Sequence, residues 1–208
     1  KNLNGKIKKK IKLDLSKISK KKKFNNLNFK DFPILMGILN LTPDSFSDGG
    51  LYNKKSLGVK HAKKLIKDGC KILDIGGEST RPGSKEVDSG KEWKRVAPTL
   101  LKVKRFKKLI SLDTRKSFVM ERGIKNKVNL INDVSGFEHD TNTIKVLKKT
   151  KIPFVIHHMQ GNPSIMQKKP KYKNVILDIY DFFEKKINFL RSYGIKHNNI
   201  ILDPGIGF

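Results

Sequence analysis

The sequence predicts an α/β protein built on parallel strands, and a (β/α) barrel is the favoured architecture. Short runs rich in Ile, Leu and Val alternate with stretches whose apolar residues recur at helical spacing. The runs are apolar on both faces, which is typical of parallel strands buried between helices. A doubly wound open sheet is the alternative, but no G-x-G-x-x-G turn follows the first run and no G-x-x-x-x-G-K occurs in the chain.

The individual elements follow from local residues, in chain order. The predicted strands are 33–40, 71–77, 109–114, 129–134, 153–158 and 199–205. The predicted helices between them are 56–69, 90–106, 116–127, 141–150 and 175–194. In the first of these helices, Val59, Ala62 and Leu65 recur at helical spacing. Gly69 and Gly194 stand where a helix ends on a left-handed residue.

The N-terminal residues 1–31 differ in composition from the rest of the chain. The stretch "KIKKKIKLDLS" (6–16) alternates enough to predict an edge strand, as a strand or hairpin that leads into the barrel, and a connection rich in lysine and asparagine follows it. A chain of 208 residues suffices for one good core and is short of two large ones. We therefore expect a lysine-rich extension (1–31) and one barrel domain (32–208).

The net charge of +27, from 46 Lys+Arg against 19 Asp+Glu, raises the alternative of a basic nucleic-acid-binding protein. The excess is lysine, whereas base and phosphate recognition relies on the arginine fork. The lysine runs also lack the interleaved aromatic residues of a single-strand groove. Lysine is overused along the whole chain, which favours solvated surface residues. We predict no nucleic-acid partner, although the positive field would help to gather an anionic substrate.

The chain shows neither a membrane segment nor a secretory signal. No window approaches a membrane-spanning length, and the basic N-terminal stretch has no apolar core with a small-residue cleavage site. Cys70 is the single cysteine, so an internal disulfide is excluded, and it is expected to be a small buried hydrophobe. We therefore predict no membrane partner and a reducing, cytoplasmic setting.

Polar residues gather at the carboxyl end of every predicted strand. In a parallel barrel these ends point to one rim, where ligands bind. Each position also has a structural interpretation, because Asp and Thr can cap a following helix and Asn-Asp or Asp-Pro-Gly can form a turn. Their repetition at successive strand ends favours a shared site. The residues are Asn40, Asp74, Asp113, Thr114, Asn132, Asp133, His157, His158 and Asp203.

The chemistry of these residues is polar, without a Ser-His-Asp set or a reactive-cysteine motif. Carboxylates and an amide in a barrel mouth suit a flat ligand with several N–H donors. The stretch "GGESTRPGS" (76–84) offers backbone N–H groups, hydroxyls and Arg81 to an anion or a second substrate. Asn40 and its loop offer oxygen atoms to a hard cation such as magnesium with a phosphate. His157 and His158 should point to opposite faces, which favours rim histidines over metal ligands.

Six motifs follow one another along the chain: "MGILNLTPDSFSDGG", "LDIGGESTRPGS", "ISLDTRK", "LINDVSG", "HHMQGNPSIMQ" and "ILDPGIGF". Taken together and in this order, they resemble the motifs of the dihydropteroate synthase family. The resemblance implies a (β/α)8 TIM barrel that condenses 7,8-dihydropterin-6-ylmethyl diphosphate with 4-aminobenzoate to 7,8-dihydropteroate and diphosphate, in folate biosynthesis, with Mg2+. It also implies a homodimer when the protein is full length.

The resemblance further implies individual roles for site residues. Asp113, Asn132 and Asp203 would be catalytic: Asp203 would grip the 2-amino and N3–H edge of the pterin, Asn132 would complete that edge, and Asp113 would stabilise positive charge at the ring. Asp74 would lie nearby and Met159 would pack at the ring. Metal and diphosphate would be bound by Asn40, and the remaining substrate-binding residues would be Thr80, Arg81 and Phe208.

Two further expectations follow from the resemblance. Family members continue through strands seven and eight, whose Ser-Arg-Lys and Arg-x-His motifs do not occur here, so about six βα units are present and we expect the isolated fragment to be inactive. A pterin-binding barrel that moves a methyl group from methyltetrahydrofolate to a corrinoid is the alternative enzyme. The "TPDSFSDGG" and "STRPGS" loops argue against it, because they suit diphosphate and 4-aminobenzoate.

Overall fold

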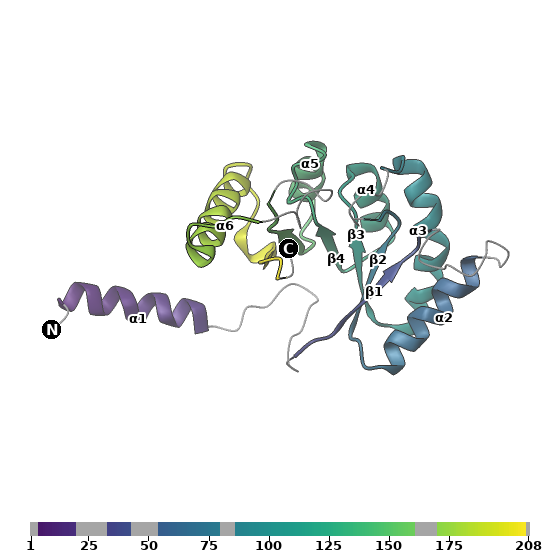
Figure 1. The fold of residues 1–208 in the computed structure, drawn as a ribbon, viewed down its shortest axis with the longest axis horizontal. Helices are drawn as coiled ribbons and strands as arrows, with labels where there is room; N and C mark the ends of the chain where they lie inside the picture. Colours follow the sequence, from purple (N-terminus) through teal and green to yellow (C-terminus); the bar gives the residue numbers. More distant parts are fainter. Residues whose placement is uncertain (1–3, 20–32, 43–53, 80–85, 161–169, 207–208) are drawn as a thin grey trace.

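The computed structural model describes residues 4–19, 33–42, 54–79, 86–160 and 170–206. Its centre is a six-stranded parallel sheet in the order β1-β2-β3-β4-β5-β6, so each strand pairs with its neighbour in the sequence (Figure 1). The strands are β1 (Met36–Asn40), β2 (Ile72–Gly76), β3 (Leu109–Asp113), β4 (Leu130–Asp133), β5 (Phe154–His157) and β6 (Ile200–Asp203). The predicted strands are confirmed, and each is shorter than expected by one to three residues in total.

Helices alternate with the strands and form an outer layer in the same order. Neighbouring helices contact one another from α2 to α5, and α2 also packs against β1. The helices are α2 (Lys54–Lys67), α3 (Ser89–Val103), α4 (Ser117–Lys125), α5 (Asn142–Lys148) and α6 (Val175–Ser192), with short 3-10 turns η2 (Lys104–Phe106) and η3 (His197–Asn199). The expected helical caps are also present, since Gly69 and Gly194 have φ values of +102° and +82°. No helix within the described residues is long and apolar enough to cross a membrane.

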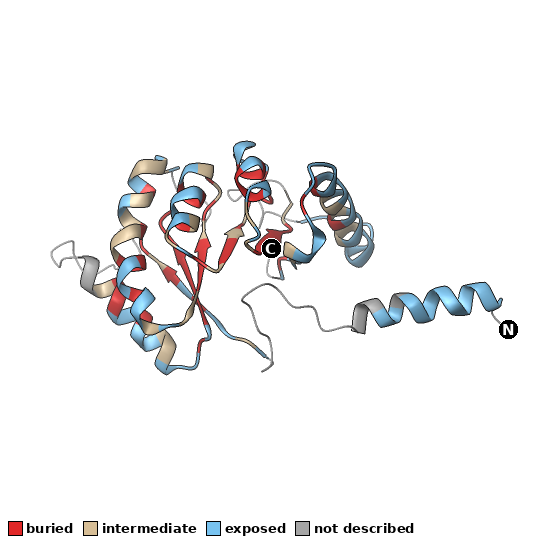
Figure 2. Cartoon of the chain, turned by 180° about the vertical axis from the view of Figure 1, so that it is seen from behind, coloured by how far each residue is buried: buried red, intermediate tan, exposed pale blue. Residues whose placement is uncertain are grey.

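Strands β2 to β5 are largely buried on both faces, as the two-sided apolar runs predict, whereas Ile38 on the inner face of β1 and Leu202 of β6 are exposed. On the outer face, Leu39, Leu73 and Leu112 are fully buried in the large core shared with the helices. Figure 2 shows the buried residues gathered on the strands and on the helix faces that cover them. On the inner face, a second cluster joins Leu130 and Val155 with the partly buried Leu109 and Ile201. The inner cluster lies at the amino end of the strands, so it forms the apolar bottom of the space below the polar strand ends.

The N-terminal segment differs from its prediction. The prediction of a strand within residues 6–16 is wrong, because Gly5–Ser19 forms a helix, α1. This helix lies apart from the sheet (Figure 1). Its Ile7, Ile11 and Leu15 recur every four residues, a spacing that places them on one helical face. Lysine, the commonest residue here, also favours helix over strand. The strand-like alternation extends only over the short stretch 11–15.

Glycine at position 77 allows β2 and α3 to approach closely. A Cβ atom on Gly77 would lie 2.8 Å from Val96 Cγ2 and 2.9 Å from the backbone oxygen of Glu92. Both neighbours are fully buried on α3, so relief requires a shift of the helix backbone. We expect Gly77→Ala to lower the free energy of unfolding by about 1–3 kcal/mol, measured by urea unfolding. Gly5→Ala is the control, because a Cβ there meets nothing within 4 Å, and equal stabilities for the two variants would contradict the prediction.

Candidate functional site

The carboxyl ends of the first four strands are aligned in register. Asn40 pairs with Gly76, Gly76 with Asp113, and Asp113 with Asn132. Residues paired in this way have side chains on the same face of a parallel sheet. This face is the inner one, since Leu109 and Leu130 of the inner cluster lie at even spacing before Asp113 and Asn132. The register thus places one amide, a glycine gap, one carboxylate and another amide in a single row.

The glycine gap lets two of these side chains meet. A Cβ atom on Gly76 would lie 3.2 Å from Oδ2 of Asp113 and 3.4 Å from Oδ1 of Asn40. The two oxygens therefore approach the same glycine from the strands on either side of it. Asp113 and Asn40 are both partly accessible rather than fully buried. The arrangement leaves oxygen atoms from two strands open to one ligand.

Asp74 lies one layer deeper on the same face, two residues before Gly76. Its Oδ2 accepts a hydrogen bond of 3.0 Å from the side-chain amide of Asn132. Its Oδ1 is buried and has no hydrogen-bond partner among the described residues. Because Asn132 uses its N–H on Asp74, its carbonyl oxygen is oriented as an acceptor for a ligand. The sequence-predicted set Asp74, Asp113 and Asn132 is thus brought together, with Asn40 at its edge.

Burial and the repulsion between neighbouring carboxylates disfavour the ionised forms of Asp74 and Asp113 in the site without a ligand. Burial raises the pKa of Asp74, with Ser111 and Asn132 partly opposing the shift. Burial, and then the negative charges of Asp74 and Asp133, raise the pKa of Asp113 well above its usual value. Crowded carboxyls favour a partner that brings N–H donors or positive charge. The site is therefore matched to a flat, donor-rich ligand and poorly matched to an anion at its base.

The ends of β5 and β6 complete the rim. His157 pairs with Asp203, and both lie two residues beyond the pair Val155–Ile201 on the inner face. The Asp203 carboxylate is exposed and accepts a hydrogen bond of 2.9 Å from the backbone N–H of Gly205. Met159 follows β5 and is half-buried.

The two adjacent histidines separate as expected. His157 Nε2 would lie 3.2 Å from a Cβ atom on Gly205, toward the β6 end. His158 instead faces α6, with its ring edge-on to Phe182 at a centroid distance of 4.9 Å. Burial lowers the pKa of His158, which keeps it neutral in that aromatic setting. Within the described ranges, no three His, Cys, Asp or Glu side chains group as metal ligands.

Some predicted residues serve structure or lie outside the described ranges. Thr114 donates its backbone N–H to Asn132 O at 3.0 Å, and its hydroxyl oxygen accepts from the Lys116 N–H at 3.3 Å. Asp133 lies on the outer face, where its Oδ1 accepts from both the N–H and the hydroxyl of Ser135. The turn interpretation is thus correct for Asp133 while its neighbour Asn132 faces the site. Thr80, Arg81 and Phe208 lie outside the described residues.

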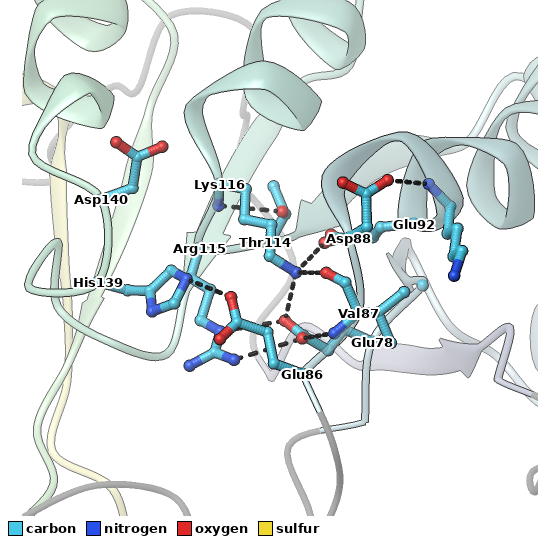
Figure 3. A network of polar contacts seen from close by, with 12 residues as sticks. Glu78, Glu86, Val87, Asp88, Glu92, Thr114, Arg115, Lys116, His139 and Asp140 are labelled. Atoms are coloured by element: carbon cyan, nitrogen blue, oxygen red, sulfur yellow. Dashed lines mark hydrogen bonds and ion pairs between the residues drawn. The ribbon is translucent and has the colours of Figure 1, made fainter.

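A buried ionic network beside the site was missed from the sequence. Lys116 Nζ lies 2.9 Å from Glu92 Oε2 and 3.0 Å from Glu78 Oε2, and Arg115 donates two hydrogen bonds to Glu78 (Figure 3). The available signal was Glu92, which stands at an apolar position of α3, four residues before the buried Val96. A charge on the buried face of a helix is rarely free of a partner.

Asp133 gives the structure a distinct pH dependence. Burial raises its pKa from 3.8 to about 6. The folded state therefore binds a proton more readily than the unfolded state, and stability falls as pH rises from about 4 to about 6. We expect Asp133→Asn to remove this loss, so its stability relative to wild type should rise by about 1.4 kcal/mol from pH 5 to pH 8. Urea unfolding at both pH values measures the free energy of unfolding of wild type and variant, and Asp68→Asn, which changes an exposed carboxylate, is the control. If the stabilities of wild type and Asp133→Asn changed equally between the two pH values, the prediction would be contradicted.

The parallel sheet and its helical layer define an α/β protein built on a partial TIM barrel, with a polar candidate binding site at the carboxyl ends of its strands. The family model described as pterin binding enzyme matches residues 36–208. The chain belongs to this family.

Individual relatives carry a more specific name. The dihydropteroate synthase of Clostridium beijerinckii is 43% identical over 182 residues, which are 87% of this chain and 65% of that protein. A Xanthomonas albilineans dihydropteroate synthase solved with 4-aminobenzoic acid superposes with a TM-score of 0.76 at 35% identity, over 86% of this chain and 63% of that one. The Burkholderia cenocepacia enzyme complexed with 7,8-dihydropteroate gives 0.73 at 34% identity, over 88% and 61%. The chain thus spans slightly less than two thirds of the length of these relatives.

Proposed function

We propose that the protein is a dihydropteroate synthase, which condenses 7,8-dihydropterin-6-ylmethyl diphosphate with 4-aminobenzoate to give 7,8-dihydropteroate and diphosphate in folate biosynthesis. The observation that carries the proposal is the convergence of Asn40, Asp113 and Asn132 on one inner row, above Asp74. Relatives solved with 4-aminobenzoic acid and with 7,8-dihydropteroate support the choice of substrate and product.

Pterin recognition is assigned to the acceptor groups of the inner face, from Asn132 above Asp74 to Asp203 at the rim. The pterin offers its 2-amino group and N3–H, and a carboxylate accepts two such parallel bonds well. Asp203 takes this edge with its accessible carboxylate, and Asn132 completes it with the carbonyl oxygen left free by its bond to Asp74. Asp113 lies by the ring nitrogens, and Met159 packs against the ring face. A polarisable thioether suits contact with an aromatic system.

The reaction needs charge stabilisation more than a strong base. The bond between the pterin methylene carbon and the diphosphate oxygen breaks, and its electron pair leaves with diphosphate. The resulting cation is delocalised over the pterin ring, where ionised Asp113 and Asp74 stabilise it. The neutral arylamine nitrogen then forms the new C–N bond and releases its proton to water or diphosphate. Burial raises the pKa of both carboxyls, and the N–H donors of the bound pterin favour their charged forms, so each carboxyl releases its proton to water when the pterin binds, before the C–O bond breaks.

The oxygen donors at the rim fit a hard cation. Asn40 and Asp113 direct oxygens over Gly76 from two strands, and Mg2+ prefers carboxylate and amide oxygens with water and phosphate. Asn40 would hold Mg2+, which neutralises charge on the leaving diphosphate. We assign Thr80 and Arg81 to the meeting point of diphosphate and 4-aminobenzoate, and Phe208 to the aminobenzoate pocket, by resemblance of their motifs.

The remaining assignments complete the proposal. The domain runs from residue 32 to 208, and the protein acts as a homodimer in the cytoplasm. The buried free thiol of Cys70 supports a reducing compartment. The partners are the two small-molecule substrates.

The test is product formation by the protein expressed from its complete gene. Incubated with the pterin diphosphate, 4-aminobenzoate and Mg2+, it should release dihydropteroate and diphosphate in equal amounts. Binding of 4-aminobenzoate should require diphosphate, which separates the proposal from a corrinoid methyltransferase. Methyl transfer from methyltetrahydrofolate, without any condensation, would overturn it.

A further inference from the structure

Two buried polar atoms lie on adjacent strands of the inner face without hydrogen bonds. Ser111 on β3 pairs in register with Asp74 on β2, and the two residues are 0% and 5% exposed. Within the described part of the chain, neither the Ser111 hydroxyl oxygen nor Asp74 Oδ1 has a hydrogen-bond partner. Leaving a buried polar atom unsatisfied lowers stability, so such atoms are rare in folded proteins. Two of them on paired residues indicate a bond that the site without a ligand lacks.

Asp74 is the acceptor that the sheet offers to the Ser111 hydroxyl. The other register partner of Ser111 is the apolar Leu130, and Leu109 lies two residues before Ser111 on the same face. Asp113 lies two residues after it, about 6.6 Å along the strand, whereas neighbouring strands are about 4.8 Å apart. The hydroxyl changes direction by rotation about the Cα–Cβ bond, so it can turn to Asp74 Oδ1 while the backbone keeps its register.

The ionisation state of Asp74 determines which half of the Asn132 amide faces a ligand. Asp74 Oδ2 accepts a hydrogen bond of 3.0 Å from the Asn132 side-chain N–H, which leaves the Asn132 carbonyl oxygen for the ligand. A carboxylate only accepts hydrogen bonds, whereas a protonated carboxyl group also donates one. Protonated Asp74 would donate to the Asn132 carbonyl oxygen, and the amide would then present its N–H group to the ligand. Because the pterin edge assigned to Asn132 carries N–H donors, this orientation would place donor against donor.

Ser111 and Asn132 are the two groups that favour the charged form of Asp74. Burial raises the pKa of Asp74, and hydrogen bonding by the Ser111 hydroxyl and the Asn132 amide lowers it. Asp113 on β3 opposes ionisation, since the charge of Asp74 raises the pKa of Asp113 and the repulsion acts on both carboxyls. On β1, the register partner of Asp74 is the apolar Ile38. When Asp74 loses its proton to water, the Ser111 hydroxyl is therefore the neighbouring donor that can turn to the new charge.

We propose that Ser111 is a positioning residue, whose hydroxyl donates to Asp74 Oδ1 in the pterin-bound protein and thereby keeps the carbonyl oxygen of Asn132 turned toward the pterin. The proposal rests on the proposed function and deepens it, because it names a residue that selects a ligand edge with N–H donors. Ser111 lies one layer below the row of Asp113 and Asn132, so it acts through Asp74 and Asn132. Without the hydroxyl, a buried N–H of the pterin loses its acceptor, which should raise the Kd of the pterin about 10- to 100-fold.

The test uses the protein expressed from its complete gene, titrated in a calorimeter with a 7,8-dihydropterin. Ser111→Ala removes the hydroxyl and should raise the Kd about 10- to 100-fold. Ser111→Thr keeps a hydroxyl at the same position and should bind within about threefold of wild type. Ser192→Ala, which removes an exposed hydroxyl on α6, is the matched control and should bind as wild type does.

A double-mutant cycle with Asn132→Ala tests whether Ser111 acts through the amide. If it does, Ser111→Ala should change the Kd less than about twofold when residue 132 is already alanine. The free energy of unfolding of ligand-free Ser111→Ala should not fall below that of wild type, because the hydroxyl that it removes is buried without a hydrogen-bond partner among the described residues. A serine with a purely structural role would lower that free energy and cost the same affinity in both backgrounds.

Pterin binding and product formation separate this proposal from the proposed function. Equal pterin affinity in wild type and Ser111→Ala would overturn the positioning role, as would equal losses in the Ala and Thr variants or an undiminished loss in the Asn132→Ala background. The role of Ser111 would then fail even if wild type made dihydropteroate. If wild type bound the pterin with the expected coupling but made no dihydropteroate, the proposed function would fail and the role of Ser111 would stand. A wild-type protein that bound no pterin would overturn both.

Discussion

Replacing Asp113 by Asn should lower kcat by about 100- to 1000-fold, the range found when one preorganised group that stabilises transition-state charge is removed. Asn has nearly the same shape and can still accept one hydrogen bond, but it cannot ionise. The carboxylate lies in the inner row, with an oxygen beside Asn40 over Gly76, where the pterin cation would form. Steady-state kinetics with both substrates measure the effect. We expect KM for the pterin diphosphate to change much less than kcat, because the charge is needed mainly in the transition state.

The matched control for this variant is Asp68→Asn, an exposed acid beyond the end of α2. It changes net charge by the same amount and should leave kcat unaltered, which excludes a general effect of the protein's positive field. Full turnover by Asp113→Asn would remove Asp113 from the mechanism. A fall in kcat matched by an equal rise in both KM values would instead assign it a binding role.

Replacing Asp203 by Asn should weaken binding of a 7,8-dihydropterin by about 100-fold. A hydrogen bond to a charged group contributes about 1.5–3 kcal/mol, and the Asn amide would also present an N–H to the donors of the pterin edge. The bond from Gly205 N–H to Oδ1 can be kept by the Asn oxygen, so the β6 end should remain folded. Calorimetric titration with the pterin measures the Kd directly.

The control for Asp203 is Asp181→Asn, an exposed acid on α6. Its Kd for the pterin should equal that of wild type. The result for Asp203→Asn should also differ from that for Asp113→Asn, since the first mainly affects binding and the second mainly affects kcat. Wild-type pterin affinity in Asp203→Asn would refute the assignment of this carboxylate to the pterin edge.

The sheet and the rim were predictable because they depend on short-range patterns. The two-sided apolar runs around Leu39, Leu73 and Leu112 determine buried parallel strands, and those residues are fully buried. The polar residues at strand ends then converge through topology alone, as Asn40 and Asp113 do. Both inferences need only the strand period and the rule that parallel strands share one carboxyl edge.

Other features depend on register and on contacts between distant segments. The Lys116–Glu92 pair joins residues 24 apart, and no local pattern states which carboxylate a buried lysine meets. Whether Asn132 or Asp133 faces the site depends on a register shift of a single residue, which reverses the side chains. For α1, the alternating apolar residues over 11–15 suggested a strand, while the four-residue spacing of Ile7, Ile11 and Leu15 determined the helix. In this lysine-rich stretch the two-residue period of a strand and the four-residue spacing of a helix are both present, so the local sequence alone does not decide between them.

The strand order described above also bears on how the chain is made. Because β1 to β6 pair strictly in sequence, every new strand finds its neighbour already synthesised. A ribosome delivers the N-terminal units first, at about 5–20 residues per second, so assembly can advance one βα unit at a time without waiting for a distant segment. Nascent-chain growth and the winding of the sheet can therefore run in the same direction.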